Sequence, residues 1–400
     1  MESFSSMTGA LGGLKVLDLS RILAGPFSTQ LLADMGAEVL KIENPRTAGD
    51  DTRQWGPPFV EQMNGDQDLS AYFISANRGK RSVAIDFGSK EGQIAIKKLA
   101  KEADILVENF KSGSLKAYGL DYESLKEINA GLIYCSITGF GQVGANSDKP
   151  GYDLMAQAYG GIMSLTGEAA GPPMKTGVAI ADVVCGLYAS SGILAALHHR
   201  NQTGEGQHID LALVDSQIAW LVNQGSNYLV TGEVPERLAN AHPSIVPYEV
   251  FKTLDGFVVI AVGNDKQFAN FSNWLDQPQW ISDERYRTNP LRLKNRTSLV
   301  SKISSVLSGI STQEVLIGLE KVGVPVGPVN SLDQVFESDQ VREREMRVDI
   351  ESPHAVGGAI PVVGNPLKFS KTPVIYNMPP PKFGEHTTEV MSRISKEEEA

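Results

Sequence analysis

The segment GLKVLDLSRILAGPFSTQLLADMGAEVLKIE, residues 13–43, changes its hydrophobic pattern twice along its length. Short apolar runs at 16–19 and 39–42 have the length of buried strands. Between them, Pro26 occupies a position that the first turn of a helix tolerates, apolar residues recur at helical spacing, and Gly36 suits the left-handed end of a helix. The segment therefore predicts a βαβ unit with parallel strands and a right-handed crossover.

Strand and helix patterns keep alternating through the first half of the chain. This alternation predicts an α/β fold with a Rossmann-like open parallel sheet, covered by helices on both faces. In such a sheet, ligands bind beyond the carboxyl ends of the strands. A long helix is expected from Asp182 to His199. Further strands are expected at 82–86, 105–108 and 132–136, and further helices at 93–102 and 122–128.

The middle of the chain has a different character. Residues 232–246 contain two prolines and scattered charges, which is typical of a linker. A hairpin pattern follows at 248–262, with the turn Asp255-Gly256 between its strands. Two helical patterns come after the hairpin. We therefore expect a small α+β domain over residues 225–325.

The composition excludes several classes of protein. With 36 basic and 47 acidic residues, the chain of 400 residues has a net charge of −11, which disfavours nucleic acid as a partner. Only Cys135 and Cys185 are present, so a disulfide framework is excluded, and the six histidines show no metal-ligand spacing. From that spacing we expect no bound metal. No unbroken apolar run reaches the roughly 18 residues that span a bilayer, so we expect no membrane partner.

Asp182 offers two interpretations. It stands where the long helix is expected to begin, after GVAIA, and Asp is a preferred N-cap residue. The same position suits a carboxylate nucleophile, because the dipole and the free N–H groups of a helix N-terminus keep a carboxylate anionic. Both interpretations are open at this point.

Polar side chains also collect where the predicted strands end. Arg21 follows the first strand, Arg46 and Arg53 follow the second, and 77–81 form a basic cluster. Asn109-Phe110 follow the strand at 105–108, where an amide and a ring suit an adenine or pantetheine ligand. Solvated loops and packed loop anchors are the alternative interpretations.

Eight motifs, in this order along the chain, carry a resemblance to a known family. They are LKVLDLSRILAGPFSTQLLADMGAEVLKIE, GDDTRQWGPPF, NRGKRSVAIDF, ADILVENFKSG, ITGFGQ, GYDLMAQA, AIADVVCGLYA and GEHTTEV. From about Leu11 to Val390 the chain resembles the class III coenzyme A transferase family, of the formyl-CoA transferase type. GPPF after GDDTR, together with AHPSIVPYEVFKTLDGF, is most similar to the branch that moves coenzyme A from succinyl-CoA to glutarate or hydroxymethylglutarate.

The resemblance implies that Asp182 is the nucleophile. Its carboxylate would attack a donor thioester, giving an acyl-aspartyl anhydride and then an aspartyl-CoA thioester that the acceptor acid consumes. No tightly bound cofactor is implied, and the coenzyme A thioester is a substrate. Arg46 would substitute for a basic residue that the family has at Asn44. The implied coenzyme-binding residues are Arg21, Ile22, Arg46, Ile85, Asn109 and Phe110.

The resemblance also implies a substrate pocket beside the nucleophile. Tyr152 and Asp153 match positions next to the catalytic aspartate, and His242, Arg21 or Arg237 would bind the distal carboxylate of a dicarboxylic acid. Glutarate, hydroxymethylglutarate, itaconate and malate are open as acceptors. A lysine and an arginine near the coenzyme in the formyl type are Thr138 and Ala117 in this chain.

For the whole molecule, the resemblance implies an interlocked-ring homodimer. The large domain would comprise residues 1–224, with a linker helix, and part of 326–400, which also holds the return linker. The small domain would be 225–325. The compartment would be the bacterial cytoplasm, or the mitochondrial matrix if the protein is a processed eukaryotic one.

Two rival functions deserve comparison. An α-methylacyl-CoA racemase shares the fold and the aspartate, but it has His-Asp where this chain has Tyr152-Asp153, and a tyrosine with a pKa of about 10 is poorly suited to moving an α-proton. A non-catalytic acyl-CoA-binding protein would be expected to lack the nucleophile, which Asp182 supplies.

Overall fold

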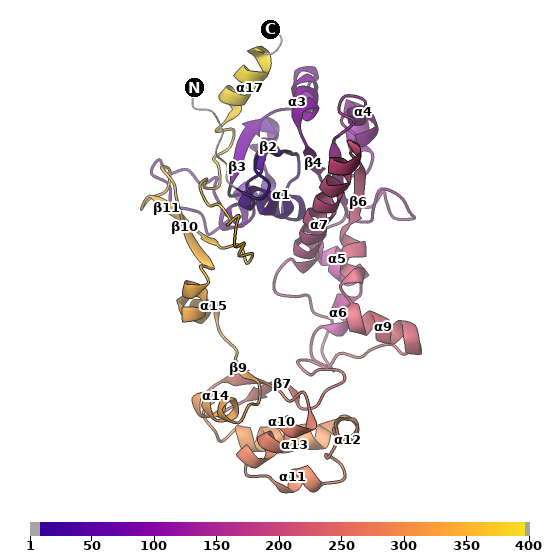
Figure 1. The fold of residues 1–400 in the computed structure, drawn as a ribbon, viewed down its shortest axis with the longest axis vertical. Helices are drawn as coiled ribbons and strands as arrows, with labels where there is room; N and C mark the ends of the chain where they lie inside the picture. Colours follow the sequence, from indigo (N-terminus) through magenta and orange to yellow (C-terminus); the bar gives the residue numbers. More distant parts are fainter. Residues whose placement is uncertain (1–8, 397–400) are drawn as a thin grey trace. The chain divides into compact units, whose positions relative to one another are not determined.

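The computed structural model describes residues 9–396 and divides into two compact units (Figure 1). The first unit runs to Ile162, continues over Thr176–Thr231 and ends with the chain from Asp339 onward. The second unit comprises Met163–Lys175 and Gly232–Ser338. Both ends of the described chain therefore belong to the first unit.

A six-stranded parallel sheet, in the order β3-β2-β1-β4-β5-β6, forms the centre of the first unit. Its strands are β1 (Lys15–Asp18), β2 (Glu38–Glu43), β3 (Lys80–Ala84), β4 (Ile105–Glu108), β5 (Ile133–Thr138) and β6 (His208–Ala212). The predicted open parallel α/β sheet is confirmed. The direction of strand order reverses between β1 and β4, which is where sheets of this kind bind their ligands.

Helices cover both faces of this sheet. Helices α1 (Ala24–Asp34), α5 (Asp153–Tyr159), α7 (Ile180–Thr203) and α8 (Leu213–Ala219) pack on one face, and α3 (Lys90–Glu102), α4 (Tyr122–Lys126) and α17 (Thr387–Lys396) pack on the other. The first unit also contains α2 (Ala71–Ile74), α9 (Val222–Thr231), α16 (Asp339–Glu343) and the 3-10 turns η1 (Pro45–Thr47), η2 (Asp51–Gln54) and η3 (Ser114–Tyr118). Successive strand residues point to opposite faces. Val16 packs in the core with α1 and α7, and Leu17 packs in the core with α3 and α17.

The predicted βαβ unit is confirmed as β1, α1 and β2, whereas other elements differ from the prediction. Strand β3 covers Lys80–Ala84, two residues before the predicted 82–86. Helix α7 begins at Ile180 with Ala179 as its N-cap residue, so the helix start predicted at Asp182 is wrong by two residues. Strand β6 was not predicted. Its sequence HIDLA includes a histidine and an aspartate that stay exposed on the sheet edge, and this weakens the apolar pattern.

The second unit contains an antiparallel sheet in the order β7-β8-β9. The hairpin of β7 (Tyr248–Lys252) and β8 (Phe257–Ala261) confirms the predicted one, and β9 (Val326–Pro328) adds a strand from the returning chain. Its helices, with α6 at the boundary, are α6 (Ile162–Leu165), α10 (Asp265–Trp274), α11 (Gln279–Ser282), α12 (Asn289–Lys294), α13 (Arg296–Leu307), α14 (Thr312–Lys321) and α15 (Leu332–Glu337). A separate core, with Phe251, Phe271 and Leu299 fully buried, supports this unit.

The C-terminal part of the chain returns to the first unit. The hairpin of β10 (Arg347–Glu351) and β11 (Ala359–Val363) packs against Leu69 and Phe73 in a small core. Helix α17 then packs on α3 and β3. The large unit thus depends on segments from both ends of the chain.

Helix α7 is long and apolar, although polar residues interrupt its apolar sequence. Over 18 residues its mean hydropathy is 1.7, so among the described residues it is one helix long and apolar enough to cross a membrane. It lies against α1, β5 and β6, with ten of its residues buried, as a helix in the core of a folded domain does.

Candidate active site

A cavity of about 390 Å³ lies at the carboxyl ends of β1, β4 and β5, beside the point where the strand order reverses. The loops that follow these strands and the start of α7 form its wall. Six of the residues predicted from the sequence line this cavity: Arg21, Ile22, Asn109, Phe110, Tyr152 and Asp182. The fold therefore brings the predicted nucleophile and most of the predicted coenzyme contacts together.

Asp182 lies in the first turn of α7, and its side chain does not cap that helix. The capping bonds come from Asp153 at the start of α5, whose Oδ1 accepts from the N–H of Ala181 at 2.8 Å and from the N–H of Asp182 at 3.4 Å. Gln157 Nε2 donates to the other oxygen of Asp153 at 2.7 Å and so orients that carboxylate. The N-cap interpretation of Asp182 is wrong, because Asp153 fills that role and leaves the Asp182 carboxyl available in the cavity.

The surroundings of Asp182 make its ionisation difficult. Its exposed fraction is 8%. Burial and, after it, the like charge of Asp153 raise the pKa of Asp182 from 3.8 to about 7. The expectation that the helix N-terminus keeps this carboxyl anionic therefore fails, since the free N–H groups point to Asp153. A carboxylate with a raised pKa is a stronger base and a better nucleophile than an ordinary aspartate.

Asn109 and Arg21 form the wall between β1 and β4. The Asn109 side chain accepts from the N–H of Arg21 at 2.8 Å and donates to the carbonyl oxygen of Arg21 at 2.7 Å. The Arg21 guanidinium pairs with Asp51 at 2.5 Å and lies 5.8 Å from the ring centre of Phe110. The amide of Asn109 is therefore occupied in fixing the loop, and Arg21 and Phe110 present a cation and a ring to the cavity.

Besides Asp153 and Arg237, three other predicted residues do not line this cavity. Ile85 is buried in the core shared with α3, and its N–H donates to the carbonyl oxygen of Glu43. Arg46 lies on the exposed turn η1 and pairs with Asp86 at 2.6 Å. His242 belongs to the second unit, where its ring stacks on Tyr248. Their predicted contacts with coenzyme and substrate stay predictions.

Sequence reasoning missed several residues that the structure places at the cavity. Lys111 and Lys149 line it and add positive charge. Lys111 directly follows Asn109-Phe110, so its place after the strand at 105–108 is a signal already present in the sequence. Trp55 also lines the cavity and packs edge-on against Tyr72, whose pKa is raised to about 12 by burial and then by Asp182 and Asp153.

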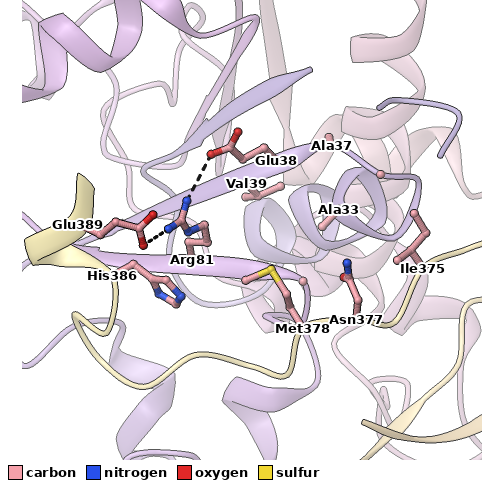
Figure 2. A pocket seen from close by; sticks show the side chains of 12 residues that line it. Ala33, Ala37, Glu38, Val39, Arg81, Ile375, Asn377, Met378, His386 and Glu389 are labelled. Atoms are coloured by element: carbon pink, nitrogen blue, oxygen red, sulfur yellow. Dashed lines mark hydrogen bonds and ion pairs between the residues drawn. The ribbon is translucent and has the colours of Figure 1, made fainter. Parts of the chain in front are cut away.

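A second cavity, of about 340 Å³, lies at the amino ends of β2 and β3 (Figure 2). Figure 2 shows the Arg81 guanidinium between the carboxylates of Glu38, at 3.6 Å, and Glu389. Gly79 and Arg81 of the predicted basic cluster 77–81 line it, so the placement of that cluster with the polar groups after the strands is wrong. The residues predicted to bind coenzyme A and substrate do not line it. Within residues 9–396 no group of three or more histidine, cysteine, aspartate or glutamate side chains is arranged to hold a metal ion. The cavity containing Asp182 is therefore the candidate active site.

The chain is similar to known CoA-transferases along nearly its whole length. The chain is 49% identical over 384 residues to the succinate–glutarate CoA-transferase of Agrobacterium fabrum, covering 96% of this chain and 95% of that protein. It is 43% identical over 384 residues to the succinyl-CoA:glutarate CoA-transferase of Homo sapiens, covering 96% and 86%. A crystal structure of a CAIB/BAIF family protein from Brucella suis superposes with a TM-score of 0.87 at 45% identity, covering 97% of this chain and 100% of that one.

The family model of CoA-transferase family III matches residues 11–387, nearly the whole chain. The resemblance predicted from the eight sequence motifs is thereby confirmed, as is the enzyme class. Because the match spans both units and includes Asp182 and the cavity around it, the chain belongs to CoA-transferase family III, and the protein is a CoA-transferase.

Proposed function

We propose that the protein transfers coenzyme A from succinyl-CoA to glutarate through a thioester on Asp182. The state of the Asp182 carboxyl carries this proposal. It is buried in the cavity, it does not cap α7 because Asp153 does so, and its pKa is raised to about 7. The names of the relatives from Agrobacterium fabrum and Homo sapiens support the pair of acids.

In the first half of the proposed reaction, a carboxylate oxygen of Asp182 attacks the thioester carbon of succinyl-CoA. The C–S bond breaks, the coenzyme A thiolate leaves, and a succinyl-aspartyl anhydride remains. The thiolate then attacks the side-chain carbonyl carbon of Asp182. The C–O bond breaks, succinate departs, and Asp182 carries coenzyme A as a thioester.

In the second half, a carboxylate of glutarate attacks the Asp182 thioester and expels the thiolate again. The thiolate attacks the glutaryl carbonyl of the new anhydride, which releases glutaryl-CoA and restores the Asp182 carboxylate. Expelling a thiolate, with a pKa of about 8.5, by a carboxylate is uphill in each half. The thiolate must therefore stay bound at high effective concentration in both halves. In the first half, where Asp182 is the attacking carboxylate, its raised pKa brings it closer to the pKa of the thiol.

The cavity offers charges suited to these substrates. Arg21, Lys111 and Lys149 line it, and coenzyme A and the two dicarboxylic acids are all anionic. Cationic side chains bind carboxylate and phosphate oxygens through charge-assisted hydrogen bonds. We assign substrate attraction to these three residues, in addition to the contacts expected from Phe110 and Tyr152.

We also propose that the protein is a homodimer of interlocked chains. Large apolar side chains are exposed on and beside α8 and α9, including Trp220, Val222, Leu229 and Val230. On α7, Leu187, Tyr188 and Leu194 form an exposed stripe at helical spacing. Contiguous apolar surface on a soluble protein marks an interaction face, and a second copy of the chain would cover it.

Incubation of the enzyme with succinyl-CoA and isotopically labelled glutarate tests the proposed function. Labelled glutaryl-CoA and succinate should form in equal amounts, measured by liquid chromatography and mass spectrometry. With succinyl-CoA alone, hydroxylamine should mark the peptide that contains Asp182, and Asp182→Asn should show no mark. Release of succinate and free coenzyme A without glutaryl-CoA would contradict transfer.

A further inference from the structure

The loop between β1 and α1 has an unfavourable backbone conformation at the wall of the active-site cavity. Ile22 has a φ of +71° and lines this cavity with Asp182. For a β-branched residue the left-handed region is a genuine outlier, because Cβ approaches the backbone too closely. Such a conformation persists only where its surroundings hold it, so the contacts of this loop identify what holds it.

Three side chains bond to successive residues of the loop. Lys41 Nζ donates to the carbonyl oxygen of Ser20 at 2.9 Å. Asn109 binds both backbone groups of Arg21. The N–H of Ile22 donates to both carboxylate oxygens of Asp50, each at 3.3 Å. The loop is thus fixed from β2, from the end of β4 and from the segment after η1.

Lys41 and Asp50 form one buried unit. Their side chains are 2.8 Å apart and fully inaccessible to solvent. Asp50 also accepts from the N–H and the hydroxyl of Thr52, at 3.0 and 2.8 Å. Burial opposes the charge on each partner, yet Lys41 lowers the pKa of Asp50 and Asp50 raises the pKa of Lys41, so both stay charged. A buried charged pair with fixed hydrogen bonds gives the loop a rigid anchor.

We propose that Asp50 and Lys41 are positioning residues, which hold the Ser20–Ile22 loop in the conformation that receives the coenzyme A part of the substrate. The inference rests on the proposed function, since it assigns the cavity beside Ile22 to coenzyme A. Neither Lys41 nor Asp50 lines the cavity that contains Asp182. Their effect passes through the backbone of Ser20 and Ile22, by removing the cost of ordering the loop when substrate binds.

The first test uses Asp50→Asn, which keeps the size of the side chain and removes its charge. Calorimetric titration with coenzyme A should give a Kd raised about tenfold, with KM for succinyl-CoA raised similarly and kcat changed less than about threefold. The matched control is Asp34→Asn. Asp34 is equally buried and pairs with Arg78 at 2.7 Å, but it makes no contact with the loop, so it should lower stability and leave the Kd within about twofold of wild type.

A second comparison separates positioning from general stability. Alanine at position 22 keeps the cost of positive φ and loses the side chain, whereas glycine loses the side chain and adopts positive φ freely. Asp50→Asn should therefore raise the Kd about tenfold in the Ile22→Ala background and less than about threefold in the Ile22→Gly background. Equal effects in both backgrounds would overturn the proposal.

Folding and the proposed function are checked separately. If circular dichroism shows that Asp50→Asn does not fold, Asp50→Glu takes its place, because it keeps the charge opposite Lys41 but moves the carboxylate away from the N–H of Ile22. Its Kd should rise as well, and an unchanged Kd would overturn the proposal. Failure of the wild type to bind coenzyme A would contradict the proposed function instead, independently of the variants.

Discussion

At the scale of single residues, capping of α7 and the proposed nucleophile belong to two different aspartates, although the sequence was compatible with both roles for Asp182. Asp153 satisfies the N–H groups of Ala181 and Asp182, and Asp182 keeps a free carboxyl in the cavity. Asp182→Asn should therefore reduce transfer by about a thousandfold or more, since an amide cannot form the anhydride. Steady-state assays measure the loss, and retained binding of coenzyme A shows that the cavity is intact.

The same substitution should change stability by an amount that depends on pH. The folded state raises the Asp182 pKa from 3.8 to about 7, so the folded protein binds this proton more tightly than the unfolded chain does. Deprotonation of this carboxyl therefore lowers the free energy of unfolding progressively between about pH 4 and pH 7, and the full loss remains above pH 7. Asp182→Asn should unfold at a higher urea concentration than wild type at about pH 8, with a smaller difference at about pH 4. A destabilised variant at both pH values would contradict this account.

The pH dependence of activity should report the same group. Only the carboxylate form of Asp182 attacks the thioester, so log kcat/KM should rise with pH through an apparent pKa of about 7 and then level off. Asp153→Asn removes the like charge and should move this pKa downward, while the asparagine still caps α7. An unchanged profile in that variant would show that Asp153 does not influence the ionisation of Asp182.

At the scale of elements, the contact between α1 and α7 holds the nucleophile in place. A Cβ at Gly186 would lie 2.7 Å from the carbonyl oxygen of Ala24 and 3.1 Å from the ring of Phe27. Gly186→Ala should therefore push the two helices apart and lower the free energy of unfolding by about 1–3 kcal/mol. Urea denaturation measures this loss, and kcat should fall because Asp182 lies one turn away.

Gly192 provides the matched control in the same helix. A Cβ there would meet only the side chain of Ile209, at 3.6 Å, which is an ordinary contact. Gly192→Ala should leave stability unchanged or raise it by up to about 1 kcal/mol, because alanine favours helix over glycine. If Gly186→Ala and Gly192→Ala lost equal amounts of unfolding free energy, the close approach of α1 and α7 at Gly186 would not be the cause of the loss.

At the scale of the whole molecule, the proposed dimer is the main prediction. The chain has a mass of 43.2 kDa, so sedimentation should give a species of twice that mass at micromolar concentration. The exposed apolar side chains around α9 make an isolated chain unfavourable in water. Substituting Leu229 and Val230 together by serine should shift the sedimentation toward the single chain or reduce solubility. A folded wild-type monomer would contradict the proposal.

The βαβ unit and the strand-end location of the site were predictable because they depend on local pattern. Apolar spacing and the helix-ending Gly36 lie within one short segment, and parallel strands necessarily bring their carboxyl ends to one edge. Arg21 and Asn109 could therefore be placed together from the sequence. The family resemblance added the role of Asp182, which helix capping alone left open.

Only the tertiary structure determined how these residues behave. The capping bond from Asp153 to Ala181 joins residues 28 positions apart, and Asn109 reaches Arg21 across 88 positions. The Asp182 pKa depends on burial and on that distant carboxylate, and the strained φ of Ile22 depends on the buried pair of Lys41 and Asp50. Hydrophobic spacing describes which way a side chain faces along its own element. It contains no information on which polar groups meet across the sheet, because those contacts form only when separate elements pack together.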